Sequence, residues 1–229
     1  MIKNILWDID GTLLNFKIAE RKAIDYCFEK FGLGICDDEM LKDYSRINHK
    51  YWGDLEKGLC TREEVLINRF HDFFSLYGFD TSICDDFNRE YQLALGETCV
   101  YCDDSLEIVK KFKEDGYKQY VITNGSKLAQ DKKLVKSGFG KLMDGIYISE
   151  NLGYEKPSIK FFEVLNNDGI NFNDSIIIGD SLTSDIKGGN NAGILTCWYN
   201  PNHMLNNGEA TANYEIDNLS DVEKIIMSI

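Results

Sequence analysis

Short apolar runs alternate with longer amphipathic segments over most of the chain, and this pattern predicts a parallel sheet covered by helices on both faces. The apolar runs are too short for helices, so we expect them to be strands. In chain order, the expected strands cover residues 3–7, 119–122, 145–149, 175–178, 194–198 and 214–216. The expected helices of this part lie around 106–112, before Ser137, at 158–166, at 184–191 and around 222–226.

The stretch between Asn15 and Glu97 has a different pattern, because its apolar residues recur at helical spacing and no strand is indicated. The first expected helix ends at Gly32, and three more are expected at 39–52, 61–77 and 86–95. Thr61 and Glu64 have the spacing of a capping box at the start of the third helix.

These two patterns together define the expected fold class. We expect a Rossmann-like, doubly wound α/β core made of residues 1–14 and 98–229. Residues 15–97 are interpreted as an all-helical cap domain inserted after the first strand. Within the core, Asp104 and Glu107 also have a spacing similar to a capping box, at the start of the helix that carries Leu106.

Composition and charge narrow the class of protein. The chain has 229 residues, 43% of them hydrophobic, so it can bury a sizeable core. Its formal net charge of −13 argues against binding to a nucleic-acid polymer or an anionic membrane, since both require basic surfaces. No stretch is apolar for long enough to span a bilayer, and the N-terminus lacks the pattern of a signal peptide.

The cysteines predict a reduced, cytoplasmic protein. There are seven of them, an odd number at irregular spacing, which does not suit a disulfide framework. Cys99 and Cys102 form the one suggestive pair, but Asp103 and Asp104 follow them and would disfavour a thiolate. We therefore interpret this pair as incidental.

Polar clusters follow four of the expected strands. These clusters are Asp8 and Asp10, Thr123-Asn124-Gly125, Lys156-Pro157, and Asp180 with Asp185. Parallel strands bring their carboxyl ends to one edge of a sheet, so the clusters can converge there. Each fragment alone could be a turn, a solvated loop or a helix cap, but four in this order favour a site.

The residue types of these clusters suit a phosphoryl group and a divalent cation. Asp8, Asp180 and Asp185 would repel one another strongly without a cation, and a small set of oxygen ligands suits Mg²⁺. Thr123, the backbone N–H groups after it, and Lys156 are donors of the kind that hold phosphoryl oxygens.

The arrangement of the four clusters resembles the haloacid dehalogenase-like (HAD) hydrolase superfamily over the whole chain. The resemblance implies that Asp8 is a nucleophile that forms an aspartyl-phosphate and that Asp10 is the general acid and base. It also implies that Thr123, Asn124, Gly125 and Lys156 bind the phosphoryl group. Mg²⁺ would be bound by Asp8, the Asp10 carbonyl, Asp180 and Asp185, the last either directly or through water. Dehalogenases of this superfamily lack an acid at the position of Asp10, so the resemblance implies a phosphatase.

Three further segments are similar to the pyrimidine 5′-nucleotidase branch of this superfamily. They are residues 12–16, residues 148–157 and residues 188–198, and the cap segment 47–52 is similar as well. The resemblance implies a small phosphomonoester substrate such as UMP, dUMP, dTMP or a non-standard analogue. One departure is Cys102-Asp103, where relatives have a Pro-Gly turn.

Base recognition is expected from the cap or from the loop that joins it to the core. Phe16 is the candidate for stacking on the base, because it lies just after the loop of Asp8 and Asp10. Asn48, Tyr51 and Trp52 are further candidates, although the two aromatic rings could simply pack inside the cap.

Two alternative functions remain open at this stage. One is a sugar-phosphate or phosphoglycolate phosphatase on the same scaffold, since fold does not determine the substrate. The other is a regulatory protein that binds phosphate without catalysis. The sequence does not distinguish a monomer from a homodimer.

Overall fold

The centre of the protein is a six-stranded, fully parallel sheet. The computed structural model describes residues 1–206, 208 and 210–229. The strands are β1 (Asn4–Trp7), β2 (Lys118–Thr123), β3 (Gly145–Ile148), β4 (Ser175–Gly179), β5 (Leu195–Tyr199) and β6 (Tyr214–Ile216). Every expected strand is confirmed to within one residue at each end.

The strand order β3-β2-β1-β4-β5-β6 is that of a doubly wound Rossmann-like sheet. The first strand lies in the middle, where Trp7 is level with Val121 of β2 and Ile178 of β4. The chain passes from β1 to β2 on one side and later returns from β3 to β4 on the other side, so a crevice opens beyond the carboxyl end of β1. The residues that directly follow β1 therefore lie where such folds bind ligands.

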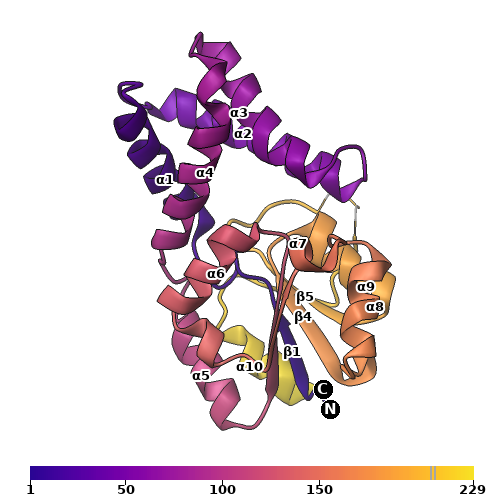
Figure 1. Cartoon of the computed structure of the whole chain (residues 1–229). Coiled ribbons are helices and arrows are strands. Elements are labelled where there is room, and N and C mark those ends of the chain that lie inside the picture. The colour runs from indigo at the N-terminus through magenta and orange to yellow at the C-terminus, as the bar shows by residue number, and fades with distance from the viewer. Residues whose placement is uncertain (207, 209) are drawn as a thin grey trace.

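Helices cover both faces of the sheet (Figure 1). Ile5 and Trp7 pack on one face with α5, α6 and α10, whereas Leu6 points to the other face with α8. This alternation is the two-residue period of a strand buried on both sides. The core helices are α5 (Ser105–Glu114), α6 (Lys127–Lys136), α7 (Ser149–Leu152), α8 (Ile159–Asn167), α9 (Lys187–Ala192) and α10 (Asp221–Ser228). Short helical turns lie at Phe139–Lys141, at Phe172–Asp174 and, in a π-helical form, at Leu182–Ile186.

Four helices between β1 and α5 form a cap that stands over the carboxyl ends of the strands (Figure 1). They are α1 (Phe16–Phe31), α2 (Asp38–Glu56), α3 (Arg62–Tyr77) and α4 (Cys84–Glu97), with a short 3₁₀ turn at Thr81–Ile83. They share a core of their own that is rich in aromatic rings, with Tyr44 stacked on Phe70 at a centroid distance of 5.2 Å. The expected all-helical insertion is thus confirmed, while its boundaries at residues 15 and 97 stay a prediction.

The two expected capping boxes have different outcomes. At α3, Thr61 Oγ1 accepts from the Glu64 N–H, and the Glu64 carboxylate accepts from the Thr61 N–H at 2.7 Å, so this prediction is confirmed. At α5 the prediction is wrong, because the Asp104 side chain makes no capping hydrogen bond. A capping side chain needs an extended backbone at its own residue, and Asp104 has φ −95° and ψ 35° instead.

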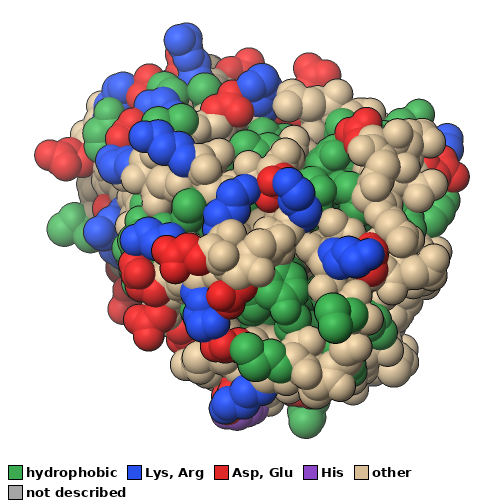
Figure 2. Space-filling view, turned by 90° about the horizontal axis from the view of Figure 1, so that it is seen from below, with side chains coloured by type: hydrophobic (Ala, Val, Ile, Leu, Met, Phe, Trp, Pro, Cys, Tyr) green, Lys and Arg blue, Asp and Glu red, His purple; other side chains and the backbone are tan. Residues whose placement is uncertain are grey.

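The outer surface and the cysteines give no indication of a further functional site among the described residues. On the face shown in Figure 2, Lys and Arg side chains are interspersed with Asp, Glu and apolar side chains. No helix among the described residues combines the length and the apolar character that crossing a membrane would require. All seven cysteines are free thiols, and burial together with the charge of Asp103 raises the pKa of Cys102 to about 12.

Candidate active site

The candidate site begins with two aspartates in the loop that follows β1. Asp8 is buried and Asp10 is half-buried, and Gly11 comes directly after them with φ +98°. A Cβ atom on Gly11 would lie 2.3 Å from the Asp180 carboxylate, so only glycine permits this close approach. The turn after β1 therefore brings the loop against the end of β4.

Lys156 lies between two of the predicted acids. Its Nζ atom donates to Asp8 Oδ1 at 2.9 Å, to Asp185 Oδ1 at 2.6 Å and to the carbonyl oxygen of Ile122 at 2.7 Å. Burial opposes the charge of this ammonium, but Asp185 and Asp8 outweigh burial and raise the pKa of Lys156. The lysine therefore remains positively charged although it is 1% exposed.

Three carboxylates meet beside this lysine. Asp8, Asp180 and Asp185 each offer an oxygen, and these atoms lie within 4.8 Å of one another. Burial, with a further contribution from the charge of Asp185, raises the pKa of Asp8 to about 7, although Lys156 opposes the shift. Burial and the charges of Asp8 and Asp185 also raise the pKa of Asp180 well above its usual value.

The donor set of this cluster fits a divalent cation. One ammonium group faces three carboxylates, so two negative charges remain uncompensated when all three acids are ionised. The lysine thus supplies part of the positive charge that the sequence alone assigned to a metal. Two remaining negative charges and an all-oxygen donor set match the charge and ligand preference of Mg²⁺.

The loop after β2 is tied to Lys156. Thr123 Oγ1 accepts from the Gly125 N–H at 3.0 Å, which leaves the hydroxyl proton of Thr123 free to donate. The Asn124 side chain accepts from the Lys156 N–H at 2.9 Å and donates to the Lys156 carbonyl at 2.8 Å. In this structure Asn124 therefore holds the Lys156 segment in place.

Comparison with known proteins assigns the family. The model of the haloacid dehalogenase-like hydrolases matches residues 5–199. The chain belongs to this family. It is 34% identical to the pyrimidine 5′-nucleotidase PynA of Streptococcus pneumoniae, over 96% of this chain and 93% of PynA. It is 26% identical to the pyrimidine 5′-nucleotidase YjjG of Escherichia coli, over 97% of this chain and 96% of YjjG.

A solved structure of a relative has the same fold as this HAD hydrolase. The magnesium-bound crystal structure of the HAD-hydrolase YfnB from Bacillus subtilis, described as revealing interdomain movement, is 32% identical. The TM-score is 0.92, and the match covers 98% of each chain. The predicted HAD fold is thus confirmed.

Asp10 of this HAD hydrolase is bound by two residues that sequence reasoning missed. Gln130 Nε2 donates to Asp10 Oδ2 at 2.6 Å, and the Lys133 ammonium pairs with Asp10 Oδ1. Both side chains lie on the buried face of α6, together with Ala129 and Leu134. Helical spacing places these two residues beside Ala129 and Leu134, but it does not reveal that this face of the helix turns toward Asp10.

A cap arginine, also missed from the sequence, reaches down to the loops of the site. Arg62 donates to the carbonyl oxygen of Asn124 at 2.9 Å, to Ser149 Oγ, and to Glu155 Oε1 at 3.2 Å. Its guanidinium carbon lies 5.5 Å from the centroid of the Trp52 ring. Arg62 therefore joins α3 of the cap to the loop after β2 and to the segment after β3.

The end of α2 also lies over the acidic cluster. Burial and the charge of Asp185 raise the pKa of Glu56 to about 7, although a hydrogen bond from Thr183 opposes this shift. A cap carboxyl group is thus held close to the expected metal ligands.

The candidate residues for base recognition have different surroundings. Phe16 is half-buried at the start of α1, and the Lys133 Nζ atom lies 5.6 Å from its ring centroid. Asn48 is buried, and its amide is engaged by Glu20, Trp52 and Arg69. The Phe16 ring also packs against the cap core, and the bonds of Asn48 occupy its amide inside the cap.

Tyr51, a second aromatic candidate for base recognition, uses its own hydroxyl group in a hydrogen bond within the cap. Tyr51 donates through its hydroxyl to Asp72 at 2.8 Å, which ties α2 to α3. The Tyr51 side chain therefore has a partner within the cap.

Proposed function

We propose that this chain is a Mg²⁺-dependent phosphomonoesterase that acts through an aspartyl-phosphate on pyrimidine nucleoside monophosphates. The observation that carries the proposal is the Lys156 ammonium held between Asp8 and Asp185, with Asp180 in the same cluster. A buried nucleophilic carboxylate beside a fixed cation and expected metal ligands is suited to attack on a phosphoryl group.

In the first half-reaction an Asp8 oxygen attacks phosphorus and the bond from phosphorus to the leaving oxygen breaks. Asp10 gives its proton to that oxygen, so the product alcohol leaves neutral. Lys156 and the Thr123 hydroxyl donate to the phosphoryl oxygens. Water then attacks phosphorus in the aspartyl-phosphate while Asp10 takes its proton, which releases inorganic phosphate and restores Asp8.

The metal site proposed for this reaction consists of Asp8, Asp180, Asp185 and the carbonyl oxygen of Asp10. Mg²⁺ bound there would add positive charge next to the phosphoryl oxygens. The magnesium-bound state of the YfnB structure supports this choice of ion.

The substrate class is proposed from the two named pyrimidine 5′-nucleotidases, which align with this chain over nearly its whole length. A panel of UMP, dUMP, dTMP, sugar phosphates and 2-phosphoglycolate tests it, with phosphate release as the readout. We expect the highest kcat/KM for a pyrimidine nucleotide. A higher kcat/KM for a sugar phosphate or for phosphoglycolate would show that pyrimidine nucleotides are not the preferred substrates. Binding of phosphate without any turnover would overturn the enzymatic proposal.

Asp10→Asn should reduce kcat by about 10²–10⁴-fold for UMP, because a ribose oxygen leaves poorly without a proton. The loss should be much smaller for p-nitrophenyl phosphate, whose phenolate leaves readily. Initial rates of wild type and variant with both substrates, at saturating Mg²⁺, give the ratio of the two losses in kcat. Equal losses would mean that Asp10 supports the site without transferring a proton.

Phe16→Ala should lower kcat/KM for dUMP or dTMP by about tenfold, because stacking on a base contributes about 1–3 kcal/mol. Turnover of p-nitrophenyl phosphate should change little. Phe31→Ala is the matched control, since Phe31 is another partly buried ring of α1 that packs on the cap core. If Phe16→Ala weakens both substrates equally, the ring only packs the loop, and base recognition lies elsewhere.

A further inference from the structure

The Asp10 carboxyl group is held on both oxygens by one helix of the core. Gln130 contacts Oδ2 and Lys133 contacts Oδ1, so the two oxygens face a neutral and a charged donor from α6. Lys133 is 1% exposed and Gln130 is 0% exposed. Burying an ammonium group is costly, and the reaction steps described above use neither side chain.

The amide of Gln130 is oriented toward Asp10. Its Nε2 end donates to the carboxylate, while its Oε1 atom is buried without a hydrogen-bond partner among the described residues. A buried acceptor without a partner costs stability, so the contact with Asp10 rather than the remaining surroundings fixes this orientation. Gln130 also lies against the loop after β2, since a Cβ atom on Gly125 would be 2.0 Å from its Nε2 atom.

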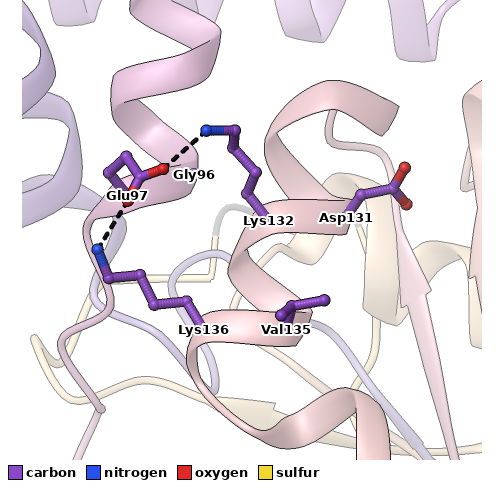
Figure 3. Close-up of a pocket in the computed structure, with 6 residues that line it drawn as sticks. All are labelled: Gly96, Glu97, Asp131, Lys132, Val135 and Lys136. Carbon is purple, nitrogen blue, oxygen red and sulfur yellow. Dashed lines mark hydrogen bonds and ion pairs between the residues drawn. The ribbon is translucent and has the colours of Figure 1, made fainter.

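Helix α6 also packs against the last helix of the cap. A Cβ atom on Gly96 of α4 would lie 2.6 Å from the Cβ atom of Lys132, so the two helices are in close contact. Glu97 receives hydrogen bonds from Lys132 at 2.7 Å and from Lys136 at 2.8 Å (Figure 3). The helix that holds Asp10 is therefore also fixed against the cap.

We propose that Lys133 and Gln130 are positioning residues that hold the Asp10 carboxyl group in the orientation needed to exchange a proton with the leaving oxygen. This inference rests on the proposed function, because it assumes that Asp10 is the general acid. Two donors at fixed positions leave the carboxyl group one rotamer, and a misplacement of about 1 Å in such a group can cost about 10²-fold in rate.

A purely structural ion pair would give a different result. Loss of a structural contact weakens the whole site, so the turnover of every substrate falls together. Loss of a positioning contact affects the step in which Asp10 takes part, so an ester with a poor leaving group loses more than an ester whose leaving group needs no proton.

The test compares Lys133→Met and Gln130→Met with the wild-type enzyme on UMP and on p-nitrophenyl phosphate. We expect kcat for UMP to fall by about 10- to 100-fold, with a much smaller loss for the aryl ester, and KM to change little. Lys132→Met is the matched control, because this neighbouring lysine of the same helix is half-exposed and pairs with Glu97 rather than with Asp10. It should leave the ratio of the two rates unchanged.

Combination with Asp10→Asn provides the second readout. If Lys133 acts through Asp10, adding Lys133→Met to Asp10→Asn should cost no further activity. Equal losses on both substrates, or losses that multiply in the double variant, would overturn the inference. If Lys133→Met does not fold, the same two comparisons with Gln130→Met decide the question.

The outcomes separate this inference from the function on which it rests. A wild-type protein that hydrolyses no phosphomonoester would overturn the proposed function itself. A wild-type enzyme that turns over UMP, together with a leaving-group effect in Asp10→Asn but none in the α6 variants, would overturn only the role of Lys133 and Gln130.

Discussion

Asp8→Asn should reduce turnover by at least about 10⁴-fold with every phosphomonoester, because an amide cannot form the covalent intermediate. The variant should fold normally, since it removes one of three clustered carboxylates and so relieves their mutual repulsion. Phosphate release measures the turnover, and the midpoint of thermal unfolding measures the fold. Wild-type activity in a well-folded Asp8→Asn protein would exclude Asp8 as the nucleophile.

A matched control and a direct readout strengthen this experiment. Asp131→Asn makes the same chemical change at a side chain that is 52% exposed on α6, and it should retain full activity. Acid-quenched wild-type enzyme treated with borohydride should contain homoserine at position 8, because borohydride reduces an acyl-phosphate. Homoserine at any other aspartate would assign the nucleophile to that residue.

Removal of divalent cations should lower activity by at least about 10²-fold, and added Mg²⁺ should restore it. The physical reason is the charge of the cluster, in which Lys156 compensates only one of three carboxylates. A bound divalent ion is worth several kcal/mol to a phosphoryl-transfer transition state. Dialysis against EDTA, followed by titration with Mg²⁺, measures the effect. Full activity in excess chelator would contradict the proposed cofactor.

Binding of the ion can be followed without measuring activity. Mg²⁺ at about 100 times its dissociation constant should stabilise the folded protein by about 2.7 kcal/mol, which appears as a rise in the unfolding midpoint. Asp180→Asn should remove most of this rise, because it deletes one of the three expected carboxylate ligands. An unchanged rise in this variant would place the ion elsewhere.

The sheet was predictable because its signal is local. Residues such as Ile5, Leu6 and Trp7 are apolar in an unbroken run, which is what a strand buried on both faces requires. The order of the clusters along the chain then places Asp8, Thr123, Lys156 and Asp180 at one edge of a parallel sheet. The main acids and the lysine of the site follow from this rule alone.

The supporting residues were not predictable in the same way. A lysine or a glutamine in a helix is usually solvated, and Lys133 and Gln130 differ only because α6 turns them toward Asp10. Arg62 makes its contacts with residues that lie between 62 and 93 positions further along the chain. Such roles depend on how helices dock, and spacing within one segment does not contain this information. The missed geometry at Asp104 has a related cause, since spacing does not specify a backbone dihedral.

The bonding of Lys156 has a consequence for how the enzyme releases its product. An ammonium group has three N–H donors, and here Asp8, Asp185 and the Ile122 carbonyl occupy all of them. If Lys156 binds the phosphoryl group as proposed, each phosphoryl group that enters must displace or share one of these partners. This cost applies to inorganic phosphate as much as to the substrate. In the proposed site, competition from Asp8 and Asp185 would therefore weaken the binding of free phosphate by Lys156. Inorganic phosphate should accordingly leave the proposed site more readily than it would leave an ammonium group without these partners.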